Sequence, residues 1–194
     1  MRVVAATGNP GKLRELSALL APLGIEVVPQ SAFGIEPPPE TGASFLDNAL
    51  IKARHAAAVS RLPAIADDSG LEVDALGGAP GIHSARYAGH GASDTANNAR
   101  LLAALANVPP GKRSARYRAI IVFVRTANDP APLVGEGRWE GRIALAARGT
   151  GGFGYDPLFE PLDASGTAAE LTPAEKNLRS HRGAALRALV AQWR

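Results

Sequence analysis

The first twelve residues contain the feature that most constrains the fold, an apolar strand that leads through a glycine-containing loop into a helix. The strand is expected over residues 2–6, and the loop reads Thr7-Gly8-Asn9-Pro10-Gly11-Lys12. Asn9 can cap the next helix, and Pro10 suits its first turn. Helix N-termini carry unpaired N–H groups and partial positive charge, and they bind phosphates. The segment indicates a phosphate-binding loop; the alternative is an ordinary strand-to-helix turn with a stray lysine.

This loop fits no standard phosphate-binding template. A Walker A loop has four residues between its first glycine and its Gly-Lys pair, followed by Ser or Thr. Here only two residues separate Gly8 from Gly11, and Leu13 follows Lys12. The loop is therefore neither a P-loop nor a GxGxxG turn.

Composition limits the classes of function. A chain of 194 residues fits a single domain, or one domain with a lobe. The sequence has no cysteine, which excludes disulfides, thiolate metal sites and a cysteine nucleophile. A net charge of +3 is too small to argue for nucleic acid. No apolar run approaches the ~20 residues of a membrane span, and the N-terminal run is too short for a signal peptide. A cytoplasmic location is expected, with no membrane partner.

The few lysines gather near motifs. Of 21 basic residues only four are lysine, namely Lys12, Lys52, Lys112 and Lys176. Lys112 follows Pro109-Pro110-Gly111 in an expected surface turn, whereas the other three lie in or beside motifs. An otherwise arginine-rich chain is expected to keep lysine where a compact, mobile ammonium is needed.

Strands and helices alternate along the sequence, which predicts an α/β fold. The first helix should bury an apolar face made of Leu13, Leu16, Leu19, Leu20 and Leu23. A cluster of glycines at Gly135, Gly137 and Gly141 is read as a bulge or turn. Strands are expected over 25–28, 64–66, 71–76, 117–125 and 133–147, and further helices over about 44–60 and 94–107 and from residue 172 to the C-terminus.

A polar stripe follows one face of the helix that Ser44 and Asp47 should cap. Asn48, Lys52 and His55 recur there at helical spacing. The pattern alone favours a solvated face, and the alternative is a face that meets an anion.

Two adjacent carboxylates, Asp67 and Asp68, follow the buried run Ala64-Ile65-Ala66. On an extended chain they point to opposite faces, so one of them should face a cleft. The alternative is a turn, because Asp-Ser-Gly is favourable turn chemistry. Glu40 is a candidate second oxygen ligand, since Mg²⁺ is usually bound by one or two carboxylates plus substrate phosphate and water.

Seven motifs in order give the chain a close resemblance to a known family. It resembles the inosine triphosphate pyrophosphatase family, the dITP/XTP pyrophosphatases, over essentially its whole length. The motifs are residues 7–12, Glu40-Thr41-Gly42, residues 48–53, residues 66–71, Gly77-Gly78-Ala79-Pro80-Gly81-Ile82, residues 151–157 and Ser180-His181-Arg182-Gly183.

The resemblance implies an elongated mixed β-sheet flanked by helices, with two lobes around a central nucleotide cleft, in a single domain over residues 1–194. It implies hydrolysis of ITP, dITP and XTP to the monophosphate and pyrophosphate, which cleans the nucleotide pool. It also implies a Mg²⁺ cofactor and a homodimer.

The family's roles carry over to matching positions of this sequence. Asp68 matches the proton acceptor, and Glu40 with Asp68 the magnesium carboxylates. Lys52 matches a phosphate-binding lysine, so the resemblance favours the anion reading of the stripe. The other matching substrate contacts are Thr7, Gly8, Asn9, Pro10, Gly11 and Lys12 for the triphosphate, Ser69, and Phe153, Gly154, Tyr155, Asp156, Lys176, His181 and Arg182 for the base and sugar.

Two alternatives stand beside this reading. A Maf-type nucleotide pyrophosphatase would act on other modified nucleotides, and the His181-Arg182 segment and the loop around Phe153 argue against it. A non-catalytic nucleotide-binding module is the second, and the presence of both Glu40 and Asp68 argues against that.

Overall fold

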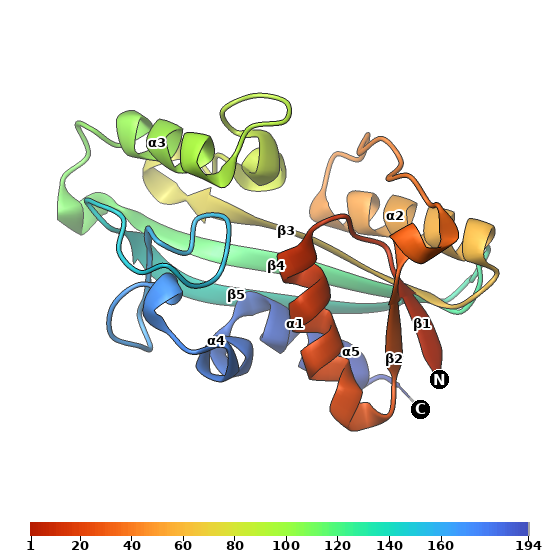
Figure 1. Ribbon diagram of the computed structural model, residues 1–194. Helices are drawn as coiled ribbons and strands as arrows, with labels where there is room; N and C mark the ends of the chain where they lie inside the picture. Colours follow the sequence, from red (N-terminus) through yellow and green to blue (C-terminus); the bar gives the residue numbers. More distant parts are fainter. Residues whose placement is uncertain (194) are drawn as a thin grey trace. The chain divides into compact units, whose positions relative to one another are not determined.

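The computed structural model describes residues 1–193, which form a six-stranded mixed sheet in the order β2-β1-β3-β4-β5-β6 (Figure 1). β1 pairs in parallel with β2 and β3, whereas β5 pairs antiparallel with β6. The expected mixed α/β fold is therefore confirmed. The strands are β1 (Arg2–Ala5), β2 (Glu26–Pro29), β3 (Ala64–Val73), β4 (Ser114–Val124), β5 (Leu133–Ile143) and β6 (Phe159–Pro161), and the helices are α1 (Pro10–Leu20), α2 (Phe45–Ser60), α3 (Asp94–Ala104), α4 (Pro173–Arg179) and α5 (His181–Val190).

The chain divides into two compact units, in agreement with the expected two lobes. Unit 1 contains Met1–Asp68, Ala119–Gly137 and the residues from Arg182 onward, and unit 2 contains Ser69–Arg118 and Arg138–His181. The boundaries fall inside β3, β4, β5 and the first turn of α5.

Unit 1 buries its apolar side chains between its strands and the helices α1 and α5. Leu16 and Leu20 are fully buried against Val3 and Ile65, and Leu189 of α5 joins the same cluster. In Figure 1, α2 lies on the other side of these strands. The prediction for Leu23 was wrong, because the α-helix ends at Leu20 and a 3-10 turn over Ala21–Leu23 changes the period. Leu23 is 50% exposed.

β3 is one unbroken strand, so the expected break after Ala66 and the turn reading of Asp-Ser-Gly are wrong. Asp67 and Asp68 lie in its middle, and both are buried. Turn propensity is overridden because each carboxylate meets cationic side chains. Asp67 meets Lys12 of α1 and Arg182 of α5, and Asp68 meets Lys52 of α2. The two side chains therefore point to opposite faces, as the alternation of a strand requires.

Unit 2 packs around aromatic side chains. Tyr117 and Trp139 both contact the ring of Phe159, with centroids 4.5 and 5.3 Å apart. Gly141 lies within β5 rather than in a turn. A Cβ there would lie 2.5 Å from the Phe159 ring, so the close packing of this ring requires glycine. The N-cap of α3 is Ser93 rather than Asp94, and this helix ends at Ala104 instead of near Asn107.

The C-terminal segment forms two helices. Thr172 and Glu175 form the expected capping box at the start of α4. Ser180 separates α4 from α5. Leu186 and Leu189 are buried as expected, and Trp193 packs on Phe123 with ring centroids 4.3 Å apart. No helix within residues 1–193 has the length and apolar character that crossing a membrane requires.

Candidate active site

The loop before α1 forms a capped helix start. The Asn9 side chain accepts hydrogen bonds from the backbone N–H of Gly11 at 2.8 Å and of Lys12 at 3.1 Å. Thr7 Oγ1 accepts from the Asn9 N–H at 3.1 Å. Two N–H groups at this helix end are thus satisfied by Asn9 itself. The charge of the Lys12 side chain therefore matters more for anion binding here than those two amides.

The Lys12 ammonium lies against Asp67. Its Nζ is 3.3 Å from the Asp67 carbonyl oxygen and 3.5 Å from Asp67 Oδ1. Burial lowers the pKa of Lys12 against the opposing charge of Asp67, and the nearby cations Lys52 and Arg182 lower it further. Three cations, Lys12, Lys52 and Arg182, thus gather around this end of α1, and carboxylates lie against each of them.

Lys52 joins the two carboxylates predicted to bind metal. Its Nζ is 2.5 Å from Asp68 Oδ1, 3.3 Å from Glu40 Oε1 and 3.1 Å from the Asp67 carbonyl oxygen. Burial raises the pKa of Asp68, and the neighbouring ammonium groups oppose this shift. A raised pKa suits a carboxylate that must accept a proton near neutral pH.

The polar stripe on α2 holds the segment that carries Glu40, so the solvated-face interpretation is wrong. Asn48 is fully buried, and its Oδ1 accepts from the Gly42 N–H at 2.8 Å. Lys52 contacts Glu40, and His55 Nε2 lies 3.1 Å from the Glu36 carbonyl oxygen. Helical spacing reveals such a stripe, but nothing in the pattern identifies the segment it binds.

The carboxylates present suit magnesium only with help from a substrate. Glu40 and Asp68 both contact the same ammonium, so their oxygen atoms lie close together. Within residues 1–193, no group of three or more His, Cys, Asp or Glu side chains is arranged to hold a metal ion. Two hard oxygen ligands match the way Mg²⁺ is bound beside substrate phosphates.

Arg182 lies in a buried ionic cluster within unit 1. Its Nε donates to Asp67 and its Nη1 donates to Glu15, and the Arg182 side chain is only 1% exposed. No sequence motif includes Glu15, whose partner is 167 residues away along the chain. This arrangement connects Glu15, Arg182, Asp67 and Lys12 by successive contacts.

A second group of predicted residues comes together in unit 2. Lys176 Nζ is 2.5 Å from Asp156 Oδ2 and 4.5 Å from the centroid of the Phe153 ring. Asp156 Oδ2 also accepts from the Phe153 N–H at 2.9 Å, while Oδ1 accepts from the Tyr117 hydroxyl at 3.1 Å. Gly152 is required here, since its φ is +70° and a Cβ would lie 2.1 Å from Asp156.

Three other predicted contacts differ in exposure. Tyr155 is buried, its hydroxyl donates to the Ser84 carbonyl oxygen at 2.8 Å, and burial raises its pKa. His181 is buried and stacks on Tyr117 with centroids 4.6 Å apart. Ser69 is half-buried in β3. Tyr155 and His181 therefore support the wall of this cluster through packing.

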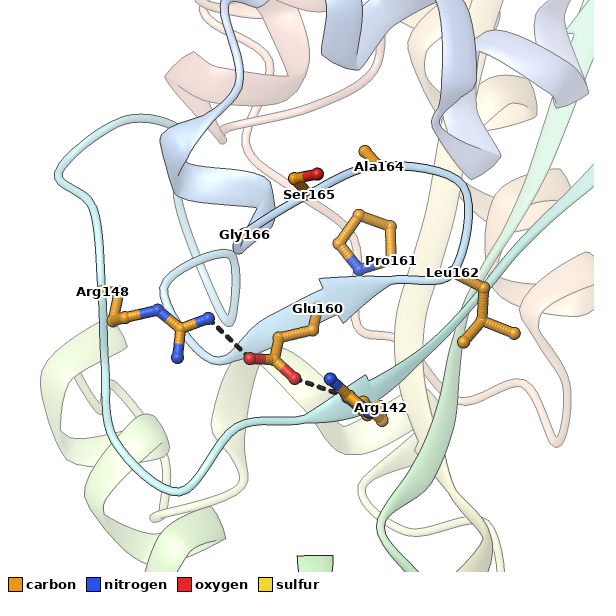
Figure 2. Close-up of a pocket in the computed structure, with 8 residues that line it drawn as sticks. All are labelled: Arg142, Arg148, Glu160, Pro161, Leu162, Ala164, Ser165 and Gly166. Atoms are coloured by element: carbon orange, nitrogen blue, oxygen red, sulfur yellow. Dashed lines mark hydrogen bonds and ion pairs between the residues drawn. The ribbon is translucent and has the colours of Figure 1, made fainter. Parts of the chain in front are cut away.

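A separate cavity of about 420 Å³ in unit 2 is lined by none of the predicted site residues (Figure 2). Its most prominent feature is Glu160, which accepts from Arg142 at 2.6 Å and from Arg148 at 2.5 Å. Both arginine side chains are about half exposed or more, so solvent screens these pairs. This cavity is not part of the candidate active site.

The fold and the sequence of this chain both match those of one family of known proteins. A solved HAM1 protein from Coxiella burnetii has the same fold, with a TM-score of 0.89, 47% sequence identity, and coverage of 100% of this chain and 98% of that one. The sequence model described as the Ham1 family matches residues 3–192. The chain belongs to the Ham1 family, which confirms the resemblance drawn from its motifs.

Two similar proteins carry a functional name. A dITP/XTP pyrophosphatase of Thioalkalivibrio sulfidiphilus is 60% identical over 190 residues, which cover 98% of this chain and 97% of that protein. A dITP/XTP pyrophosphatase of Methylococcus capsulatus is 58% identical over 193 residues, covering 100% of this chain and 96% of that protein.

Proposed function

We propose that this protein hydrolyses the deaminated purine nucleoside triphosphates ITP, dITP and XTP to the monophosphate and pyrophosphate. Relatives named dITP/XTP pyrophosphatase cover nearly the whole chain at up to 60% identity. The observation that carries the proposal is the contact of Lys52 with both Asp68 and Glu40, beside Lys12. These side chains supply carboxylates to bind the metal and accept a proton, and ammonium groups to bind the phosphates.

The reaction is attack of water on the α-phosphorus. The water oxygen forms a bond to phosphorus, the bond to the bridging oxygen breaks, and pyrophosphate leaves with its electron pair. Asp68 accepts the proton of the water, a role that its buried carboxylate supports. Glu40 and Asp68 would hold Mg²⁺, which when bound neutralises phosphate oxygens and lowers the pKa of water.

The lysines hold the phosphates. Lys12 and Lys52 come from two different helices, and both contact the same Asp67 carbonyl oxygen. Their ammonium groups therefore lie close together, and we assign them to the negative charge that develops on the leaving pyrophosphate. Fixed charges of this kind need little reorganisation during reaction. Thr7, Gly8, Asn9, Pro10 and Gly11 complete the triphosphate-binding loop.

The loop around Phe153 in unit 2 binds the base and sugar. The Phe153 ring offers a flat face for a purine, worth about 1–3 kcal/mol by analogy with single-strand binders. A 6-keto purine presents an acceptor where adenine presents an amino donor. The Lys176 ammonium, fixed on Asp156, would donate to the keto oxygen and oppose the amine.

Arg182 acts less directly in this proposal than its motif implies. Its guanidinium binds Asp67 and Glu15 in unit 1, and we assign base readout to Lys176. Ser69 and Gly154 line the base and sugar pocket, and the buried Tyr155 and His181 support it from behind. A homodimer, a cytoplasmic location, absence of nucleic-acid and membrane partners, and action of residues 1–194 as a single domain belong to the same proposal.

A pyrophosphate-release assay tests the proposal. Purified protein with Mg²⁺ is given ITP, XTP, dGTP, ATP and a modified pyrimidine triphosphate. We expect ITP and XTP to be hydrolysed far faster than ATP, with a ratio of kcat/KM that can reach ~10⁴, because buried donors reject a base that leaves them unpaired. Preference for the pyrimidine would instead support a Maf-type enzyme. Nucleotide binding without release of pyrophosphate would support a non-catalytic module.

A further inference from the structure

Two side chains of α3 form hydrogen bonds with the backbone of one residue in the loop around Phe153. Asp94 Oδ2 accepts a hydrogen bond from the Gly154 N–H at 2.7 Å, and Asn98 Nδ2 donates to the Gly154 carbonyl oxygen at 2.8 Å. Asp94 and Asn98 are four residues apart, so they lie on the same face of the helix. α3 thus holds both polar groups of a single residue in a loop far along the chain.

The adjacent residue, Phe153, is held by Asp156. Asp156 Oδ2 accepts from the Phe153 N–H at 2.9 Å, and the Asp156 N–H donates to the Phe153 carbonyl oxygen at 3.3 Å. All four backbone polar groups of Phe153-Gly154 therefore have partners. Asp156 is itself fixed by Lys176 and Tyr117.

The loop needs such contacts because of its composition. Residues 149–156 contain four glycines, at positions 149, 151, 152 and 154. Glycine loses more conformational freedom on ordering than any other residue. Asp94 does not cap α3, because the N-cap is Ser93, which accepts a hydrogen bond from the Ala96 N–H. Its carboxylate instead makes a charge-assisted bond to the loop, which is stronger than a neutral one.

We propose that Asp94 and Asn98 are positioning residues that hold the Phe153 ring ready to stack on the purine base. This inference rests on the proposed function and adds to it a helix that none of the family motifs includes. The groups assigned to the chemistry, Asp68, Lys52 and Glu40, come from other elements. Loss of the hydrogen bonds from Asp94 and Asn98 to Gly154 should therefore raise KM for every nucleotide and leave kcat nearly unchanged.

The first test is steady-state kinetics on ITP. Asp94→Ala and Asn98→Ala should each raise KM on the order of tenfold, the effect expected from loss of a hydrogen bond that includes a charge or fixes a loop. Asp94→Asn keeps an acceptor and should stay within about threefold of wild type. Thr95→Ala, at an exposed position of the same helix turn, is the matched control and should leave KM and kcat unchanged.

The second test separates positioning of Phe153 from general damage to the fold. In a Phe153→Ala background, adding Asp94→Ala should raise KM by less than about twofold, because the ring that it positions is gone. Hydrogen–deuterium exchange over residues 149–156 should rise in Asp94→Ala and Asn98→Ala but not in Thr95→Ala.

The outcomes distinguish the two proposals. If wild-type protein hydrolyses ITP and Asp94→Ala raises KM equally with and without Phe153, the positioning role is overturned. Unchanged exchange of the loop in both alanine variants also overturns it. If wild-type protein hydrolyses none of the nucleotides, the proposed function fails, and the exchange experiment still decides whether α3 orders the loop.

Discussion

Replacing Arg182 by methionine tests the buried ionic cluster of unit 1. Arg182→Met removes the donor groups that meet Asp67 and Glu15 but keeps a side chain of similar length. The Asp67 side chain is 0% exposed and the Glu15 side chain 13% exposed. Removing one partner of a buried ion pair costs about 3–5 kcal/mol, because a charge stays buried without compensation.

The lower end of that range applies here. Lys12 Nζ lies 3.5 Å from Asp67 Oδ1 and continues to compensate part of the charge. We therefore expect a loss of about 3 kcal/mol in the free energy of unfolding. For a chain of this length, each kcal/mol lowers Tm by about 2–4 °C, so Tm should fall by about 6–12 °C.

Thermal unfolding followed by circular dichroism gives the first measurement. Arg187→Met is the matched control, because Arg187 is exposed on the same helix and should change the free energy of unfolding by no more than about 0.5 kcal/mol. Adding Glu15→Gln to Arg182→Met should recover part of the loss, since one of the two carboxylates becomes neutral. Arg182→Met with a Tm within about 2 °C of wild type would refute the reasoning.

The same variant has a kinetic signature. Because the guanidinium binds carboxylates in unit 1, Arg182→Met should lower kcat/KM for ITP and for ATP in similar proportion. A selective loss on ITP would show instead that Arg182 reads the base.

Three further predictions concern individual charges. Asp68→Asn should lower kcat for ITP at least ~100-fold with the fold intact; near-normal turnover by a folded variant would remove Asp68 as proton acceptor. Lys52→Ala should lower hydrolysis of every nucleotide in similar proportion, with exposed Lys112→Ala as control, and an altered ratio of ITP to GTP hydrolysis would place Lys52 away from the phosphates. Asp129 accepts from the Arg125 and Ala131 N–H groups at 2.8 and 3.0 Å, and these bonds hold its pKa below its usual value. Its stabilising effect is therefore present above the unfolded pKa of about 3.9 and is lost as pH falls through the folded pKa. Asp129→Ala should lower Tm at pH 7 and much less at pH 3; an equal loss at both values would contradict this assignment.

Local signals were sufficient where the partners are close in sequence. The cap by Asn9, the helix start at Ser44 and the capping box at Thr172 all depend on atoms within a few residues. Each was predicted because such contacts form from neighbouring residues whatever the rest of the chain does.

The continuity of β3 could not be predicted in the same way. Asp67-Asp68-Ser69-Gly70 has turn chemistry, and an extended strand is favourable there because β3 pairs with β1 and β4 and distant cations meet both carboxylates. The partner of Asp67 on α5 is 115 residues away in sequence. A sequence pattern carries no record of which distant charge will meet a given carboxylate.

The candidate site also contains residues that the sequence identified and residues that only tertiary contacts reveal. Motif resemblance gave residues such as Lys52, Asp68 and Lys176 together with their roles, which stay predictions. It gave no indication of Glu15, Asp94 or Asn98, which touch the predicted residues or their backbone through tertiary contacts. The polar stripe on α2 was found by its spacing, but the segment it binds was not.

Gly135 shows how a position without chemistry of its own can limit the variation a chain tolerates. A Cβ at this position of β5 would lie 2.0 Å from the Ala185 carbonyl oxygen and 2.8 Å from the Leu189 Cβ. Those atoms belong to the backbone and core of α5, so they cannot move aside as a flexible side chain could. In a saturation-mutagenesis library, position 135 should therefore lose all nineteen substitutions, alanine included. Gly135 would then tolerate substitution as poorly as the residues that we assign to the reaction.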